Sequence, residues 1–222
     1  MSKNGLVLFD LDGTLVDSHE AIYNSAISVL SLYSALLPTK EEVFKSVGLP
    51  IKDLFSLYLD NSIIDSAVQD FRNHLRDFGG NKTKLLPNAV STLEKFKAEG
   101  VGIGLVSNKK TALATSVLEQ QNIDTYFDLV IGSDLGAPKP SPEMINLSLS
   151  RFSEAKYFVM VGDRLEDMLA AKLAGIQGVF LENQWNPTSN IEALFPFKPK
   201  VINNLNEVFQ AFIEIKGDLN VR

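Results

Sequence analysis

Residues 6–14 read Leu-Val-Leu-Phe-Asp-Leu-Asp-Gly-Thr, an apolar run that ends in two carboxylates. The apolar part is typical of a buried strand, and alternation along an extended chain sends residues i and i+2 to the same side. Asp10 and Asp12 are therefore predicted to face one pocket, where one carboxylate can attack and the other can transfer a proton. Gly13 permits a turn that lets the backbone approach a ligand closely. The alternative is a strand end followed by an ordinary Asp-Gly turn.

The composition is that of a globular protein. The chain has 222 residues, of which 45% are apolar, so it can form one domain plus a substantial insertion. Its net charge is −6 with scattered Lys and Arg residues, which argues against binding to nucleic acid or to a membrane surface. It contains no cysteine, which excludes disulfides and thiolate chemistry. The N-terminal stretch does not resemble a signal peptide and no stretch approaches the roughly 20 apolar residues of a membrane span, so we expect a cytoplasmic location.

After the first strand, apolar residues recur at helical spacing. This spacing predicts four helices, over residues 18–33, from the capping-box pattern of Thr39 and Glu42 to about Gly48, over 52–59, and from about Ile64 to Phe78. A parallel crossover needs only a dozen or more residues, so this excess is expected to fold as a unit of its own. We predict a helical cap domain over residues 17–84, inserted into a catalytic core made of residues 1–16 and 85–222. The two linkers make the cap a candidate moving lid.

From Asn88 onward, helices and strands alternate. The predicted strands cover residues 101–106, 129–132, 158–161 and 179–181, and the predicted helices cover 88–97, 111–120, a segment beginning near Pro142, and 165–174. This alternation is typical of an α/β fold, here a Rossmann-like parallel sheet covered by helices on both faces. In such sheets the binding crevice lies beyond the carboxyl ends of the strands. Trp185 and the tail from Ile202 to Ile215 are expected to serve packing.

Polar residues follow three more of the predicted strand ends. Ser107 and Asn108 can hold an anion or cap a helix. Lys139 lies between two prolines, which stiffen its backbone, although a loop lysine is usually just solvated. Asp163 and Asp167 can face the same crevice or serve as ordinary residues of a helix start.

Together these residues predict a site. Asp10, Asp12, Asp163 and Asp167 are four acids that converge on one crevice, where they would repel one another if unpaired. A hard divalent cation resolves the repulsion, and a few carboxylates with water and substrate phosphate suit Mg²⁺ better than Ca²⁺. Lys139 and Ser107 would bind the remaining phosphoryl oxygens. This is the inventory that phosphoryl transfer requires.

Four ordered segments, Asp10–Thr14, Ser107-Asn108, Lys139-Pro140 and residues 162–167, resemble the four motifs of the haloacid dehalogenase superfamily. The resemblance is to its phosphoglycolate phosphatase-like branch with a helical cap, and it covers roughly residues 6–181.

The resemblance implies roles for the matched residues. It implies that Asp10 is the nucleophile that forms an aspartyl-phosphate, and that Asp12 protonates the leaving group and later activates water. The implied Mg²⁺ ligands are the Asp10 side chain, the Asp12 backbone carbonyl and Asp163, with Asp167 in support of the metal waters or Lys139. Ser107, Asn108 and Lys139 are the implied phosphate ligands, and Lys139 also counts among the catalytic residues.

Specificity is expected to come from the cap. The segment over residues 48–52 resembles the family's cap loop, so Lys52, or alternatively Lys45, can meet a distal anionic group of the substrate. Arg72 and Arg76 are further candidates, and for each of these cations the alternative is a solvated surface residue. His19 and His74 are expected to be structural. Arg164 departs from the small residue common in relatives, and its side chain is expected to point outward along the start of its helix.

The main functional hypothesis is Mg²⁺-dependent hydrolysis of a small phosphate monoester such as phosphoglycolate. Dehalogenation is disfavoured, because the dehalogenases of the superfamily lack an acid at the position of Asp12. The alternatives are pyrophosphate hydrolysis and a phosphosugar mutase of the beta-phosphoglucomutase type. A different class is a non-catalytic phosphometabolite-binding protein, which would be expected to lack a catalytic acid. The expected partner is a small phosphorylated metabolite, without nucleic acid or membrane, and the protein is expected to be a monomer or homodimer.

Overall fold

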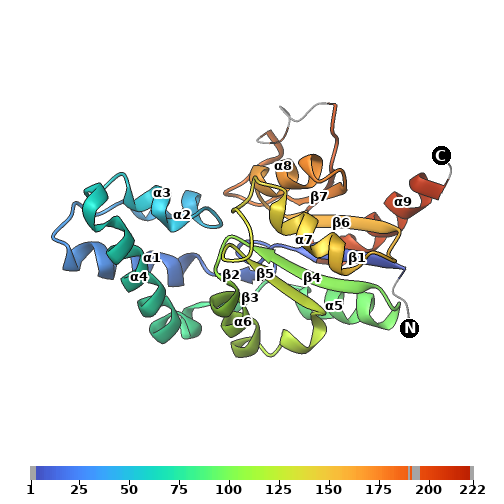
Figure 1. The fold of residues 1–222 in the computed structure, drawn as a ribbon. Coiled ribbons are helices and arrows are strands. Elements are labelled where there is room, and N and C mark those ends of the chain that lie inside the picture. Colours follow the sequence, from blue (N-terminus) through green and yellow to red (C-terminus); the bar gives the residue numbers. More distant parts are fainter. Residues whose placement is uncertain (1–3, 190, 192–195, 221–222) are drawn as a thin grey trace.

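A six-stranded parallel sheet forms the centre of the larger part of the molecule, in the strand order β5-β4-β1-β6-β7-β8 (Figure 1). The computed structural model describes residues 4–189, 191 and 196–220. The six strands are β1 (Gly5–Phe9), β4 (Gly102–Ser107), β5 (Leu129–Gly132), β6 (Tyr157–Gly162), β7 (Gln177–Leu181) and β8 (Lys200–Ile202). The central strand β1 is buried along its whole length, so its carboxyl end, which carries Asp10, is held in a fixed place.

Helices cover both faces of the sheet. The side chains of Val7 and Phe9 pack against α5 (Ala89–Ala98), α6 (Thr111–Gln120) and α9 (Val208–Asn220). Those of Leu6 and Leu8 pack on the opposite face against α7 (Glu143–Arg151) and α8 (Leu165–Leu173). Short 3₁₀ helices occur at η1 (Gly80–Lys82), η2 (Asp124–Tyr126) and η4 (Leu205–Glu207). Side chains of β1 alternate between the two faces, and both faces are covered by helices. Together with the parallel pairing of β1 with β4 and β6, this confirms the predicted α/β class with a parallel sheet.

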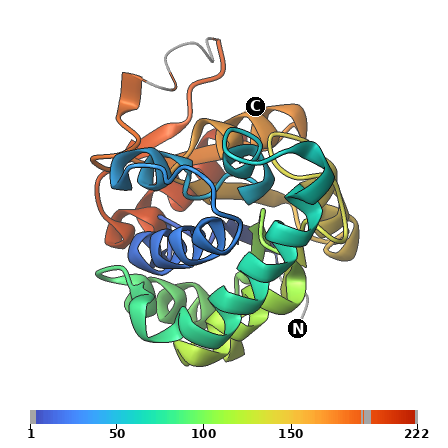
Figure 2. The same ribbon diagram turned by 90° about the vertical axis from the view of Figure 1, so that its left-hand side faces the viewer.

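A helical lobe projects from one end of this sheet, and Figure 2 views the molecule from the side of the lobe. It contains α1 (His19–Leu32), α2 (Lys40–Ser46), α3 (Ile51–Phe55) and α4 (Asn61–Phe78). The lobe has its own apolar cluster, which includes Val29, Leu30, Phe55 and Phe71. The predicted capping box is confirmed, because the Glu42 N–H donates to Thr39 Oγ1 over 3.2 Å and the Thr39 N–H donates to Glu42 Oε2 over 2.7 Å.

The lobe and the sheet are joined by a small antiparallel pair, β2 (Val16–Asp17) and β3 (Lys84–Leu85). Val16 pairs with Leu85, and Asp17 pairs with Lys84. Linkers are what the sequence predicts at these positions. Strands of two residues are too short to show a periodic pattern, so neither β2 nor β3 could be predicted. The predicted boundaries between core and cap fall on this pair, and the division into two domains stays a prediction.

The C-terminal part of the described chain completes the sheet. β8 pairs with β7 at one edge, and α9 contributes Phe212 and Ile215 to the apolar cluster below β1. A packing role is what the sequence predicts for this tail, and the structure adds that the tail packs through a strand and a helix. Among the residues that the structure describes, none of the helices combines the length and apolar character needed to cross a bilayer.

Candidate active site

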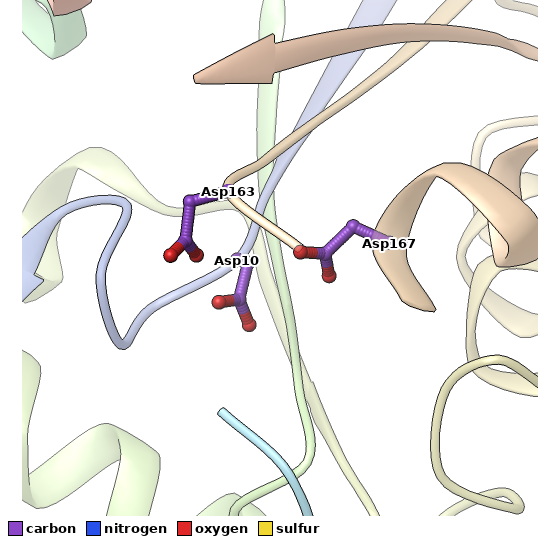
Figure 3. A group of neighbouring side chains, drawn as sticks. All are labelled: Asp10, Asp163 and Asp167. Atoms are coloured by element: carbon purple, nitrogen blue, oxygen red, sulfur yellow. The ribbon is translucent and has the colours of Figure 1, made fainter. Parts of the chain in front are cut away.

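Three buried carboxylates meet at the carboxyl end of the sheet (Figure 3). Asp10 follows β1, Asp163 follows the neighbouring strand β6, and Asp167 lies in the first turn of α8. The Asp10 N–H donates to the Val161 carbonyl over 2.9 Å, which continues the pairing of the two strands and brings their ends together. One carboxylate oxygen from each acid lies within 4.8 Å of the others. Parallel pairing of β1 with β6 is thus what creates the cluster.

Lys139 supplies the positive charge of this cluster. It lies in the connection between β5 and α7, and its side chain is only 2% exposed. Its Nζ donates to Asp10 Oδ1 over 2.6 Å, to Asp167 Oδ1 over 2.6 Å and to the Val106 carbonyl over 2.9 Å. A single buried lysine therefore offsets part of the charge of two buried carboxylates.

The pKa values of the cluster reflect this crowding. Burial raises the pKa of Asp10 to about 8, although the charge of Lys139 opposes the rise. Burial also raises the pKa of Asp163 to about 7, and the neighbouring Asp167 carboxylate adds to the rise. Burial lowers the pKa of the Lys139 ammonium, but its two carboxylate partners outweigh this and raise the pKa above its ordinary value. Without a further cation the cluster thus tends to hold protons.

Asp163 is fixed by three side-chain donors. Thr14 Oγ1 donates to its Oδ1 over 3.1 Å, while Asn183 and Asn186 donate to its Oδ2 over 2.9 Å and 3.0 Å. A side chain at Gly13, which has φ +83°, would overlap the Asp163 carboxylate, so only glycine fits there. Neither asparagine is among the site residues predicted from the sequence. The signal that could have found them is their position just beyond the carboxyl end of β7, at the same sheet edge.

Asp12 stands apart from the three-carboxylate cluster. Its buried carboxylate accepts hydrogen bonds from Ser18 Oγ and Lys109 Nζ. The prediction was that four acids converge on one crevice. Three of them form the close cluster, while the Asp12 carboxylate lies beside it on the wall of a cavity, and its charge is among those that raise the pKa of Asp10. The metal contact implied for Asp12 is through its backbone carbonyl, and it stays a prediction.

Ser107 ends β4 and Asn108 follows it, at the same edge of the sheet. The buried Ser107 Oγ accepts from the Lys109 N–H over 3.2 Å. Asn108 Oδ1 accepts from the Lys139 N–H over 2.8 Å, and its Nδ2 donates to the Gly48 carbonyl of the lobe over 2.9 Å. In this structure Asn108 therefore positions both Lys139 and the loop that follows α2. Phosphate binding by either residue stays a prediction.

A cavity of about 260 Å³ opens between the sheet and the lobe. Its cationic lining residues are Lys52, Arg72, Lys109 and Lys110, and its apolar ones include Ile22, Phe71, Leu75 and Leu113. Asp12 also lies on its wall, so the two predicted specificity residues, Lys52 and Arg72, share one cavity with the predicted acid–base residue. On the lobe surface Lys52 also pairs with Asp65 over 2.9 Å. Lys45 pairs with Glu41 over 2.7 Å, and Arg76 pairs with Asp77 over 2.8 Å.

The two histidines have structural partners. His19 Nδ1 lies 2.7 Å from Asp17 Oδ1, and its ring packs on Phe44. His74 Nδ1 lies 3.0 Å from Ser25 Oγ inside the lobe.

Arg164 does not point outward as expected. Its Nη1 donates to the carbonyl oxygens of Lys45 and Val47, over 3.0 Å and 2.8 Å, so the side chain extends from the core to the lobe. The prediction was wrong because the last carbonyls of α2 need hydrogen-bond donors. The lobe brings these carbonyls close to Arg164, and this approach is a long-range property of the fold.

The donor set of the cluster fits a hard divalent cation. Three neighbouring carboxylates supply oxygen ligands. Burial raises the pKa values of Asp10 and Asp163, so an added positive charge would offset the cost of burying their ionised forms. The arrangement combines a buried carboxylate at a strand end, a buried cation and a further carboxylate beside a cavity. It is suited to the displacement of a phosphoryl group.

Comparison with known proteins supports this interpretation. The family model for haloacid dehalogenase-like hydrolases matches residues 7–181. A phosphoglycolate phosphatase from Aquifex aeolicus is 33% identical over 172 residues, which cover 77% of this chain and 81% of that protein. A pyrophosphatase PpaX from Bacillus velezensis is 31% identical over 171 residues, which cover 76% and 79%. The solved structure of a haloacid dehalogenase-like hydrolase from Streptococcus pneumoniae has a TM-score of 0.82 at 25% identity and covers 96% of this chain and 100% of its own. The chain therefore belongs to the haloacid dehalogenase-like hydrolase family.

Proposed function

We propose that this protein is a Mg²⁺-dependent phosphatase that hydrolyses a small phosphate monoester through an aspartyl-phosphate on Asp10. The observation that carries the proposal is the place of Asp10. Its carboxylate lies at the end of a buried central strand and contacts Lys139, and it belongs to the cluster with Asp163 and Asp167. A fixed carboxylate beside a buried cation is what an attack on a phosphate anion requires.

In the first step, an Asp10 carboxylate oxygen attacks phosphorus, and the bond between phosphorus and the leaving-group oxygen breaks. Lys139 offsets the negative charge that builds up as two anions approach each other. In this step Asp12 gives a proton to the leaving-group oxygen, so that this oxygen leaves as a hydroxyl group. The position of Asp12 on the cavity wall supports this role, because the leaving group is expected to occupy that cavity.

In the second step, water attacks the phosphorus of the aspartyl-phosphate, and the bond from phosphorus to the Asp10 oxygen breaks. The Asp12 carboxylate accepts the proton of this water, so the same residue acts first as acid and then as base. Ser18 and Lys109 both contact that carboxylate and fix its orientation. Inorganic phosphate and free Asp10 result.

The side chains of Asp10 and Asp163 and the backbone carbonyl of Asp12 would hold Mg²⁺, with Asp167 in support. The bound ion would supply positive charge that lets the carboxylate and the phosphate come together. Thr14, Asn183 and Asn186 keep the Asp163 carboxylate in place for this purpose.

The cavity supports a small leaving group that carries negative charge. Lys52, Arg72, Lys109 and Lys110 line it, whereas Asp12 is its one acidic lining residue in the described part of the chain. A phosphoglycolate-like ester, whose leaving group bears a carboxylate, suits this lining. The similarity to a protein named phosphoglycolate phosphatase points in the same direction.

Pyrophosphate is a second candidate, because the same cations suit a leaving group that is itself a phosphate. The similarity to a pyrophosphatase PpaX favours this alternative. Hydrolysis of pyrophosphate yields two phosphates and no organic product, so the two candidates differ in their products.

A phosphate-release screen in Mg²⁺ buffer distinguishes them. The substrates are phosphoglycolate, sugar phosphates, nucleoside monophosphates and pyrophosphate. Rapid acid quenching during turnover, followed by mass spectrometry, is expected to find a phosphoryl adduct on the Asp10 peptide that hydroxylamine removes. Efficient turnover without an adduct at Asp10, in a protein that tolerates Asp10→Asn, would overturn the covalent route.

A further inference from the structure

Arg164 connects the acidic cluster to the lobe. It directly follows Asp163, and its side chain is only 11% exposed. Nε donates to Glu166 Oε2 over 3.2 Å, while Nη1 donates to the carbonyls of Lys45 and Val47. The guanidinium thus has one carboxylate partner in the core and two carbonyl partners in the lobe.

The lobe partners are groups that need a donor. α2 ends at Ser46, so the carbonyls of Lys45 and Val47 lie where a helix leaves its last oxygens without intrahelical partners. A cation at the C-terminal end of a helix is favourable, and hydrogen bonds from a charged donor are stronger than neutral ones. Arg164 therefore stabilises the place where α2 gives way to the segment of residues 47–52, which comprises the connection to α3 and the first two residues of α3 and is called the loop below.

The fit between this loop and Arg164 is close. Gly48 has φ +90°, and a Cβ there would lie 2.6 Å from Arg164 Cδ. The loop then continues through Leu49 and Pro50 to Lys52, and all of residues 47–52 line the cavity. The Arg164 side chain, which holds the start of the loop, therefore also helps to position the residues that line this wall of the cavity.

The backbone of Arg164 is fixed as well. Its N–H donates to Asp167 Oδ2 over 3.0 Å, and Asp167 Oδ1 contacts Lys139. A single residue is therefore held by the acidic cluster through its backbone and holds the lobe through its side chain.

We propose that Arg164 is a positioning residue that fastens the loop of residues 47–52 to the core and thereby encloses the substrate. Its effect on the loop is independent of the proposed function, whereas its effect on substrate binding rests on that function. Because the Arg164 side chain contacts the lobe and Glu166 and none of the proposed reacting groups, Arg164 is expected to act on binding more than on the chemical step.

Hydrogen exchange of the full-length protein in Mg²⁺ buffer, without substrate, tests the effect on the loop. The amides of Val47 and Leu49 donate to the carbonyls of Phe44 and Ser46, so they report on its order. Arg164→Gln should speed their exchange about tenfold or more, since tenfold is the equivalent of one charge-assisted hydrogen bond, while the amides of β1, β4 and β6 exchange as in the unaltered protein. Arg164→Lys, which keeps the charge and can reach one carbonyl, should give an intermediate rate.

Arg151→Gln is the matched control, because Arg151 is an exposed arginine in the last turn of α7. It removes the same charge from the core and should leave exchange in the loop unchanged. Loop exchange in Arg164→Gln that equals that of the control would overturn the proposal. Faster exchange that extends equally over the sheet would overturn it too, since the effect would then be on overall stability.

Kinetics with phosphoglycolate, and with pyrophosphate in parallel, test the effect on the substrate. Arg164→Gln should raise KM about tenfold and leave kcat within about twofold, as loss of uniform binding requires, and Arg164→Lys should restore part of the loss. A fall in kcat with unchanged KM would overturn the positioning role. If the unaltered protein turns over neither compound, the proposed substrates fail, while the exchange experiment still decides whether Arg164 fastens the loop.

Discussion

The Lys139–Asp10 pair at the end of the sheet and the Lys52–Asp65 pair on the helical lobe contain the same two residue types. The first is 2.6 Å long with side chains 2% and 5% exposed, and the second is 2.9 Å long with side chains 60% and 86% exposed. A buried pair cannot lose one partner without leaving an uncompensated charge, whereas an exposed pair exchanges its partner for water. The sheet end is therefore suited to fixed chemistry, and the lobe is suited to variable recognition.

The sharpest test of this contrast is Asp10→Asn. The amide has nearly the same shape as the carboxylate but is a poor nucleophile, so turnover should fall by about four orders of magnitude or more. Phosphate release and circular dichroism are the measurements, and the fold should persist. Ordinary turnover by this variant would contradict the role proposed for Asp10.

A pair of matched lysine variants compares the two regions in stability. Lys139→Met leaves the carboxylates of Asp10 and Asp167 buried without their cation, so the free energy of unfolding should fall by about 3 to 5 kcal/mol. Lys52→Met, which removes the exposed lysine, should change it little. Urea denaturation of both variants at one pH measures the two free energies of unfolding. Equal losses in the two variants would mean that the burial of a pair does not determine how much it contributes to stability.

Metal binding should depend on pH in a direction set by the acidic cluster. In the metal-free protein the pKa values of Asp10 and Asp163 are raised to about 8 and about 7, so the folded state holds protons that the unfolded state has released. The contribution of these two groups to stability therefore decreases as the pH rises from their unfolded pKa, 3.8, through these values.

Mg²⁺ binds the ionised carboxylates, so its affinity should rise over the same interval, about tenfold per pH unit for each proton released. Titration calorimetry between about pH 6 and pH 8.5 measures this effect. Activity should disappear in EDTA and return with added Mg²⁺. Full activity in metal-free buffer, or an affinity that does not change with pH, would refute a metal site at these acids.

The smallest expected effect is on recognition. Lys52→Ala and Arg72→Met should each raise KM for an anionic substrate about fivefold to tenfold, the equivalent of one exposed charge contact or slightly more. Their kcat should change little, because neither residue belongs to the acidic cluster. Steady-state kinetics with phosphoglycolate and pyrophosphate would also show which of the two compounds depends more on these cations. A large loss of kcat in either variant would place the lobe in the chemical step.

The contrast also explains what could be predicted from the sequence. The end of β1 carries a local signal, because an apolar run followed by Asp10 and Asp12 predicts both a buried strand and polar groups at its exit. The parallel sheet then brings Asp163 to the same edge, since β6 is the next strand in the sheet. The chemistry at strand ends is therefore readable from patterns within a few residues, whereas the strand order comes from the structure.

Contacts between distant segments carried no such signal. Arg164 was expected to point outward, and only the position of the lobe shows that α2 presents its carbonyls to it. Asn183 and Asn186 have no residue pattern of their own, and only their position just beyond the carboxyl end of β7 points to the site. The turn of Asp12 toward Lys109 likewise depends on the approach of β4, not on any feature of residues 10–14.

The β2–β3 pair has one more consequence. Because Val16 pairs with Leu85 and Asp17 with Lys84, the chain leaves the sheet and returns to it at adjacent points, about 5 Å apart as in any antiparallel ladder. The insertion is thus a cassette whose two ends meet. A corresponding segment from another family member can therefore be joined at the same two points. Such a replacement offers evolution, or an engineer, a route to new selectivity while the catalytic residues of the sheet are kept.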